Sequence, residues 1–179
     1  MSRPPSTTGR NMSRTTLSLS SKNYSSWSLR GWLMAKLAKI DFDEVIVAPD
    51  DADARAEILL LSPSILVPCL TYNGMRVWDT LAIGEFLNEV APKAGLLPKD
   101  QAMRAHCRSI CGEMHSGFTS LRQALPMNIK AEFPKFKIWS KAKGDIDRIL
   151  VIWPSACRPM AGRSCSARSA WPTRCTRRW

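Results

Sequence analysis

The chain has 179 residues, 45% of them hydrophobic, which is enough for one large or two small globular domains with a sizeable core. Its net charge of +11 lies mainly at the two ends, because residues 15–153 contain 17 Lys or Arg and all 15 acidic residues. Residues 1–14 add three Arg and residues 154–179 add six. A nucleic-acid-binding protein gathers its basic groups on a folded face, so this distribution argues against that class.

The chain carries no sign of a membrane span or an export signal. No apolar run approaches the roughly 18 residues that a transmembrane helix needs. Residues 1–14 are polar and basic and lack the apolar region of a signal peptide, so we expect a disordered leader, with Met12 as an alternative start. Cysteines without an export signal indicate a reducing, cytoplasmic location.

The first elements alternate between strand and helix. Residues 15–20 alternate weakly and predict a strand, and a loop rich in hydroxyl side chains follows over 23–30. Apolar residues at helical spacing then predict an amphipathic helix of about three turns. A second strand is expected over 42–47, and a short helix over 50–61 that the Ser-Pro pair at 62–63 ends.

A hairpin is the strongest local signal. Two β-prone runs, 67–72 and 75–78, flank an Asn-Gly pair at 73–74. Pro68 is tolerated at the start of a strand only where the ladder does not need its N–H group, or where a cis bond shapes the chain. Such a bend leaves the backbone of Val67 free to pair with a peptide-like ligand.

A helix is expected directly after the hairpin. Asp79 and Thr80 precede an apolar pattern formed by Leu81, Ile83, Phe86 and Leu87. A hydroxyl group and free N–H groups at a helix start suit a carboxylate ligand. The order of elements over 15–90 predicts an α/β thioredoxin-like domain, with a four-stranded mixed sheet and helices on both faces.

A linker with two prolines over 91–98 separates this domain from an all-α C-terminal domain over 99–153. Asp100 is expected to cap one long helix that ends at Pro126, because apolar residues recur at steps of three or four. Cys107, Cys111 and His115 share one face of that helix, a spacing that suits soft-metal ligation. No companion cluster completes a ligand set, so we expect core packing and no metal.

The stretch 67–87 resembles the glutathione-binding half of the glutathione transferase family, whose usual form is V-P-x-L, a hairpin and (E/D)-(S/T)-x-A-I-x-x-(Y/F)-L. The resemblance implies that Val67, before a cis Pro68, pairs through its backbone with the cysteinyl part of glutathione. It also implies that Asp79 and Thr80 hold the γ-glutamyl end.

The loop Ser25-Ser26-Trp27-Ser28-x-Arg30 resembles the S-S-x-S-x-R loop of serine-type transferases such as the bacterial zeta-like members. The resemblance implies that Ser25 is the catalytic hydroxyl, with Ser26 as second choice and Tyr24 as the alternative from other classes. From the residues alone, a serine here is better explained as a helix N-cap, and the downstream motif with its resemblance favours the functional interpretation. In the functional interpretation, its hydroxyl donates to a bound thiolate and lowers the thiol pKa.

The implied activity is conjugation of glutathione to small electrophiles by a homodimer. The family's second-substrate pocket lies along the long helix, so Met114, His115 and Phe118 are candidate lining residues. A glutathione-dependent isomerase and a non-catalytic binding or regulatory relative are the alternatives.

The last segment, 154–179, has no helical or strand period and contains six Arg, three Cys, two Trp and three Pro, with no Asp, Glu or Lys. We back-translated this segment with synonymous codons chosen to favour a reading frame shifted by one base. In that frame, residues 162–170 become P-F-L-F-G-A-F-G and residues 171–179 become M-A-D-A-M-Y-A-P-V. The recovered phrase resembles the start of the family's buried sixth helix. We interpret the chain as a frame-shifted, truncated transferase with a non-native basic tail.

A genuine basic tail is the alternative, and the nucleotide sequence near codon 154 decides between the two. Truncation predicts that Met114, Phe118 and Leu121 lose their cover, at a cost of about 1.5–3 kcal/mol for each large exposed side chain. Weak activity or poor solubility would follow, since total stability is only about 5–15 kcal/mol.

Overall fold

The computed structural model describes residues 14–47 and 67–157. The predicted helix over 50–61 lies outside the described residues, as do residues 1–13 of the expected leader and 158–179 of the expected tail. Residues 154–157, which the sequence assigns to the tail, form the end of a helix.

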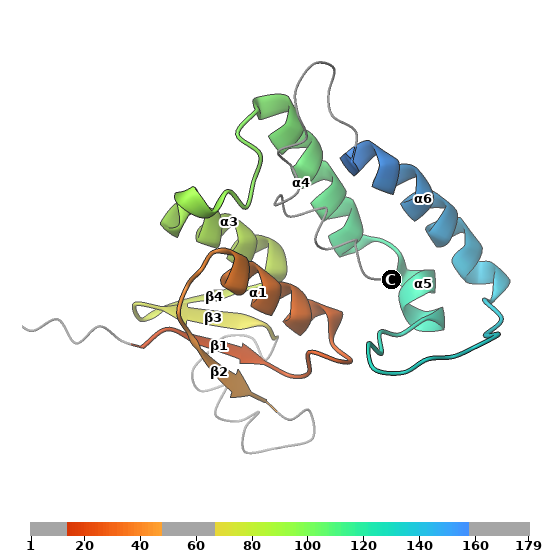
Figure 1. Cartoon of the computed structure of the whole chain (residues 1–179), viewed down its shortest axis with the longest axis horizontal. Coiled ribbons are helices and arrows are strands. Elements are labelled where there is room, and N and C mark those ends of the chain that lie inside the picture. Colours follow the sequence, from red (N-terminus) through yellow and green to blue (C-terminus); the bar gives the residue numbers. More distant parts are fainter. Residues whose placement is uncertain (1–13, 48–66, 158–179) are drawn as a thin grey trace, which may run out of the picture.

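The N-terminal part contains one mixed sheet of four strands in the order β2-β1-β3-β4 (Figure 1). These are β1 (Thr16–Leu19), β2 (Asp43–Ile46), β3 (Cys69–Tyr72) and β4 (Met75–Trp78). The β1–β2 pair is parallel, whereas the β1–β3 and β3–β4 pairs are antiparallel. The predicted mixed sheet and its hairpin are therefore confirmed.

Helices α1 (Ser26–Leu37) and α3 (Thr80–Val90) lie side by side on one face of this sheet (Figure 1). Inward side chains of the strands and of these two helices form the first core, into which α4 also inserts residues. Its fully buried members include Leu17, Leu19, Ala35, Leu70, Ile83 and Leu87. This arrangement confirms the thioredoxin-like domain.

The helical part contains α4 (Gln101–Ser116), α5 (Thr119–Ala124) and α6 (Lys143–Cys157). Short 3-10 turns lie at Pro92–Ala94 in the linker and at Ser140–Ala142 before α6. Within the described ranges, no helix is both long enough and apolar enough to cross a membrane.

The single long helix predicted from Asp100 to Pro126 is wrong, because the chain turns a corner between α4 and α5. Asp100 caps α4 as expected, with its Oδ1 accepting from the Met103 N–H at 3.0 Å. At the corner, Phe118 adopts a left-handed conformation with φ 63°. Its ring packs in the same core as Met114 and Leu121. The helical spacing of apolar residues therefore continues through the corner, and the sequence pattern does not show that the helix ends there.

The expected loss of cover over this helix is also wrong. Met114, Phe118 and Leu121 are only 7%, 7% and 8% exposed. They form a second core with Ile110 of α4 and Ile152 of α6. Among the exposed apolar side chains of the helical part are two on α6 and four in the segment that precedes it: Leu150, Val151, Phe133, Phe136, Ile138 and Trp139.

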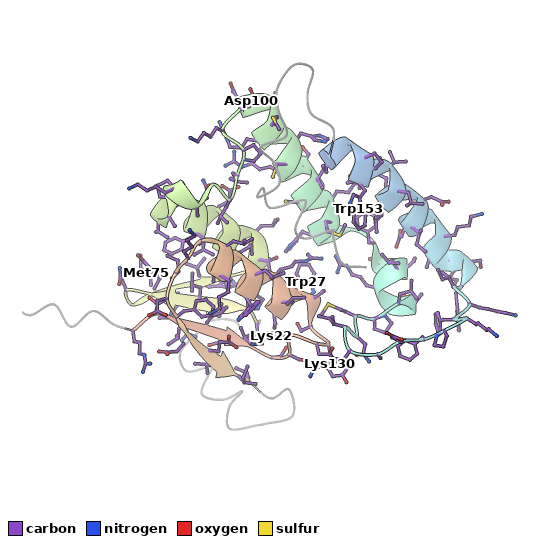
Figure 2. All side chains as sticks on the ribbon, viewed as in Figure 1. Lys22, Trp27, Met75, Asp100, Lys130 and Trp153 are labelled. Atoms are coloured by element: carbon purple, nitrogen blue, oxygen red, sulfur yellow. The ribbon has the colours of Figure 1, made fainter. Side chains whose placement is uncertain are left out.

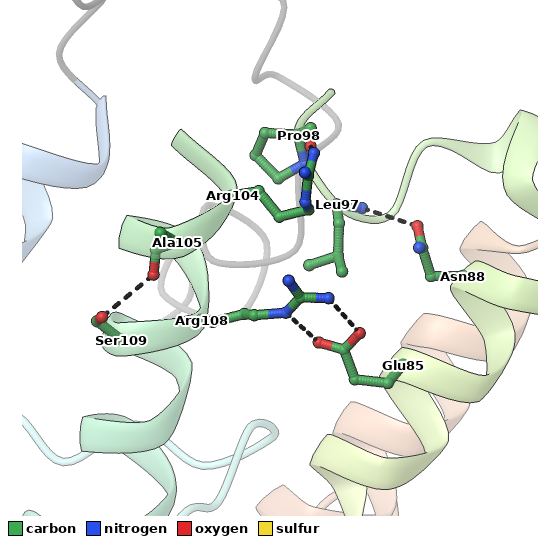
Figure 3. A network of polar contacts seen from close by, with 8 residues as sticks. All are labelled: Glu85, Asn88, Leu97, Pro98, Arg104, Ala105, Arg108 and Ser109. Atoms are coloured by element: carbon green, nitrogen blue, oxygen red, sulfur yellow. Dashed lines mark hydrogen bonds and ion pairs between the residues drawn. The ribbon is translucent and has the colours of Figure 1, made fainter. Parts of the chain in front are cut away.

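An arginine–carboxylate pair connects the two parts across the α3–α4 contact (Figure 3). The Arg108 guanidinium donates to Glu85 Oε1 at 2.7 Å and to Oε2 at 2.8 Å. Nearby, the Leu97 N–H donates to Asn88 Oδ1 at 3.3 Å, which fixes the linker against α3. These bonds set the position of α4 relative to the sheet.

This pair predicts a pH-dependent contribution to stability. The hydrogen bonds from Arg108 hold the pKa of Glu85 below its ordinary value of 4.5. A carboxyl whose pKa is lower in the folded state stabilises the fold fully above its unfolded-state pKa, and this stabilisation is lost as the pH falls through the folded-state pKa. We therefore expect Glu85→Gln to lower the free energy of unfolding at neutral pH, and the difference from wild type to vanish in acid.

Urea unfolding of both proteins between about pH 7 and pH 2 measures this difference. Glu89→Gln, at an exposed carboxylate of the same helix, is the matched control and should give no such pattern. A Glu85→Gln difference that persists unchanged in acid would contradict the assignment.

Candidate functional site

Ser25 lies at the start of α1 as its N-cap, with its Oγ accepting from the Ser28 N–H at 3.2 Å. A hydroxyl that accepts one hydrogen bond keeps its own O–H to donate. The capping role and the thiolate-binding role are therefore compatible in one side chain. Ser26 is the first residue of α1, and both serines are half-buried, whereas Tyr24 is 67% exposed.

Ser28, the third serine of the motif, is fully buried. Its Oγ accepts from the Ser20 N–H at 3.1 Å and lies 3.2 Å from the Ser20 hydroxyl. Ser28 therefore fixes the loop between β1 and α1, which sets where Ser25 lies. The serines of this one sequence motif therefore differ in role: Ser28 is structural, and Ser25 is the candidate for chemistry.

The peptide bond between Val67 and Pro68 is cis, as the resemblance implied. Pairing of β3 with β1 begins opposite Ser18 at Cys69, so Val67 lies just outside that register. Helix α1 passes directly over the proline at Gly31, where a Cβ atom would lie 2.7 Å from both Cβ and Cγ of Pro68. This contact fixes α1 over the residue that precedes β3.

Asp79 caps α3 from a strained backbone conformation, φ 72° and ψ 135°. Its Oδ1 accepts from the Leu81 N–H at 2.8 Å and from the Ala82 N–H at 3.4 Å. Strain of this kind costs about 1–3 kcal/mol and gathers at functional sites. Thr80, the first residue of α3, is only 2% exposed.

His115 comes from the last turn of α4 and reaches this helix start. Its Nε2 lies 3.1 Å from Asp79 Oδ2, and its Nδ1 lies 3.5 Å from the Thr80 hydroxyl. Met114 and Phe118 instead pack in the second core. Of the three residues named for a second-substrate pocket, the structure brings only His115 to the predicted glutathione-binding residues, and the pocket role of all three stays a prediction.

Trp27 lies in the first turn of α1 (Figure 2), and its ring contacts three side chains. Its ring meets His115 edge-on at 4.8 Å, while the Arg30 and Arg122 guanidinium carbons lie 4.7 and 5.0 Å from its centroid. Desolvation, followed by repulsion from Arg30, lowers the pKa of Arg122. Two cations thus border the start of α1.

Arg122 also closes the corner after α4. Its Nη2 donates to the Met114 carbonyl at 2.5 Å and its Nε donates to the Gly117 carbonyl at 3.2 Å. Asp145 of α6 accepts from the Leu121 N–H at 2.8 Å and so holds α5 beside it. Sequence reasoning missed both residues, since nothing local shows which backbone group a distant side chain will satisfy.

A second missed contact ties the serine loop to the segment after α5. Asn23 donates from Nδ2 to Asn128 Oδ1 at 3.0 Å and accepts from the Lys130 N–H at 3.1 Å. Figure 2 shows Lys130 beside this loop. The helical part therefore helps to set the loop that carries Ser25.

Cys107 and Cys111 are buried in the first core. The hydrogen bond with Cys107 and burial raise the pKa of Cys111 strongly. Their neighbour in the pattern, His115, is directed to Asp79 instead. Over 14–47 and 67–157, no three His, Cys, Asp or Glu side chains are grouped to hold a metal ion.

Comparison with known families agrees with this geometry. Residues 24–90 match the family model described as the N-terminal domain of glutathione S-transferase. Over these residues, the chain is similar to that domain family. The match spans the serine loop, the cis-proline and the start of α3, which are the three places where candidate residues gather.

Two related proteins from other organisms are named after an isomerase. A protein called "Probable maleylacetoacetate isomerase" from Caenorhabditis elegans is 32% identical over 96 residues, covering 54% of this chain and 44% of that protein. The "Maleylacetoacetate isomerase" of Mus musculus is 32% identical over 100 residues, covering 54% of this chain and 45% of that protein. The chain thus spans less than half the length of these two relatives.

Solved structures share the fold of the sheet domain and of the helices that follow. Glutathione S-transferase 1-6 from Anopheles dirus species B is 21% identical, with a TM-score of 0.67 over 89% of this chain and 74% of that one. A glutathione transferase homolog from Burkholderia gl BGR1, with bound glutathione, is 25% identical, with a TM-score of 0.52 over 62% of this chain and 60% of that one. The fold of a thioredoxin-like domain followed by helices is therefore shared.

Proposed function

We propose that this chain is a glutathione S-transferase that conjugates glutathione to small electrophiles. The observation that carries the proposal is a pair of helix starts on one face of the sheet. Ser25 caps α1, Asp79 caps α3 and Thr80 is the first residue of α3, and these two helices pack together. Each start presents hydroxyl or N–H groups with the positive end of a helix dipole, which suits the thiolate and carboxylate of one tripeptide.

Each residue has a role in this proposal. Thr80 and the start of α3 bind the γ-glutamyl carboxylate, and the backbone of Val67 pairs with the cysteinyl residue. Ser25 donates a hydrogen bond to the sulfur and favours its ionised form. The thiolate then attacks an electrophilic carbon, forming a thioether while the electron pair leaves with a displaced group or moves onto a conjugated acceptor. No metal takes part.

A second candidate is a glutathione-dependent isomerase, favoured by the names of the related proteins. In this reaction the thiolate adds to an activated carbon–carbon double bond, the new single bond rotates, and the thiolate leaves to re-form the double bond. Glutathione is regenerated, so no thiol is consumed. A non-catalytic binding protein is the third possibility.

Further parts of the proposal concern the molecule as a whole. We infer a cytoplasmic homodimer of bacterial origin, as the family resemblance implies. The frame shift near Trp153, with the impaired activity that truncation would bring, also stays a prediction. The α6 helix passes through this position to Cys157.

Three assays on the full chain separate the candidates. We expect retention on immobilised glutathione and thioether formation with 1-chloro-2,4-dinitrobenzene at least about tenfold faster than without protein. Isomerisation of a cis-configured conjugated keto acid without loss of free thiol would favour the isomerase instead. Retention with neither reaction indicates a binding protein, and absence of retention would contradict all three candidates.

A further inference from the structure

Both histidines of the chain lie on α4, but their surroundings differ sharply. His106 is exposed on that helix. His115 lies at its last turn and directs both ring nitrogens at the start of α3, toward Asp79 and Thr80. The sheet domain and the helical part meet at this point. His115 of the helical part therefore adds to the polar surroundings of Asp79 and Thr80 in the sheet domain.

We propose that His115 is a positioning residue for the γ-glutamyl end of glutathione, acting through Asp79. This inference rests on the proposed function, because it concerns the same ligand. It assigns to the helical part a direct role in shaping a site that otherwise consists of residues from the sheet domain.

The contact with Asp79 defines the direction of the hydrogen bond. An ionised carboxylate only accepts hydrogen bonds, so Nε2 of His115 must carry the proton that faces Asp79 Oδ2 at 3.1 Å. The other oxygen, Oδ1, accepts from the Leu81 and Ala82 N–H groups. The two oxygens of Asp79 are thus held from opposite sides, one by α3 and one by α4.

Charge gives this arrangement its effect on a ligand. The γ-glutamyl end carries an ammonium group beside its carboxylate, so an ionised Asp79 can accept a hydrogen bond from the ammonium while Thr80 donates one to the carboxylate. A hydrogen bond from His115 fixes the orientation of the Asp79 carboxylate, so less freedom is lost when the ligand binds. Asp79 sits on a strained backbone, and such a conformation persists only when its surroundings hold it.

Packing holds the histidine itself in place. Its ring packs edge-on against the ring of Trp27, with the two centroids 4.8 Å apart and an angle of 69° between the ring planes. The Nδ1 contact with the Thr80 hydroxyl is longer, at 3.5 Å, so the Asp79 contact is the stronger of the two.

Calorimetric titration of the full chain with glutathione tests the proposal. We expect His115→Ala to weaken glutathione binding about tenfold, because a hydrogen bond to a charged group is lost. Its affinity for cysteinylglycine, which lacks the γ-glutamyl residue, should stay within about twofold of wild type. In steady-state assays the KM for glutathione should rise about tenfold, while kcat and the KM for the electrophile stay unchanged.

Two conservative variants locate the effect within the ring. The amide nitrogen of Gln can reach the position of Nε2, whereas that of Asn reaches only the position of Nδ1. We therefore expect His115→Gln to restore binding to within about threefold of wild type, and His115→Asn to stay about tenfold weaker. If His115→Ala fails to fold, this comparison still decides the matter, and equal affinities of the two variants would overturn the proposal.

His106→Ala is the matched control and should bind glutathione as the wild type does. If the wild-type chain binds no glutathione, the proposed function fails. If it binds, and His115→Ala binds equally well, only the role of His115 fails. Equal weakening for glutathione and cysteinylglycine would likewise overturn that role, because it would indicate a general loss of structure.

Discussion

Replacing Ser25 with Ala is expected to lower the turnover of glutathione conjugation about 100-fold, because the bound thiolate loses a positioned hydrogen-bond donor. Ser25 lies at the start of α1 and its hydroxyl accepts from the Ser28 N–H, so its own proton remains to be donated. The loss concerns ionisation of the thiol, and glutathione affinity near neutral pH should change much less. The pKa of the bound thiol is therefore expected to rise.

Ultraviolet absorbance of the thiolate, titrated against pH in the complex, measures that pKa directly. The same substitution removes a helix cap, which costs about 1 kcal/mol, so the free energy of unfolding is measured alongside. Ser26→Ala is the matched control, because Ser26 is the neighbouring hydroxyl within the first turn of the same helix. Equal losses for the two variants, or an unchanged thiol pKa in Ser25→Ala, would contradict the assignment.

Replacing Gly31 with Ala is expected to lower the free energy of unfolding by about 1–3 kcal/mol, the usual cost of forcing a methyl group into a packed site. The new Cβ atom would lie 2.7 Å from two ring atoms of Pro68. A proline ring cannot rotate away, so α1 must shift as a body. That shift displaces Ser25 relative to Val67, and glutathione binding should weaken as well.

Chemical denaturation compares this variant with Gly112→Ala. Gly112 also lies within a helix, but a Cβ atom there meets no heavy atom within 4 Å. Only the difference in helix propensity between Gly and Ala then matters, so the free energy of unfolding of Gly112→Ala should rise by about 0.5–1 kcal/mol. Opposite signs for the two substitutions would confirm that close approach to Pro68, and not helix propensity, governs position 31. Two variants of equal stability would refute it.

Local signals in the sequence located several parts of the site. The Asn-Gly pair predicted a hairpin, and Asn73 and Gly74 both adopt positive φ, 49° and 79°. Asp79 and Asp100 were expected at helix starts, and each accepts from a backbone N–H two or three residues ahead. Such features depend on a few neighbouring residues, so they can be read from the chain alone.

Other features had no local signal. The corner at Gly117 and Phe118 interrupts a helix whose apolar period continues unchanged, because both sides of the corner feed the same core. Arg122 holds that corner by donating to two backbone carbonyls that helix ends leave without helical partners. The prediction of an uncovered helix failed for the same reason, since the position of α6 is not encoded near residue 114.

By itself, the sequence determined the order of the described strands and helices as far as the start of α4, the caps, the hairpin and the likeness to glutathione transferases, because each depends on residues close together in the chain. Only the tertiary structure decided that His115 meets Asp79 and Thr80 and that two arginines contact the Trp27 ring. Thr80 and His115 are 35 residues apart, and only the packing of α4 against α3 brings them into contact. The separation of two residues along the chain does not say how their helices pack, so contacts of this kind can be identified only from the tertiary structure.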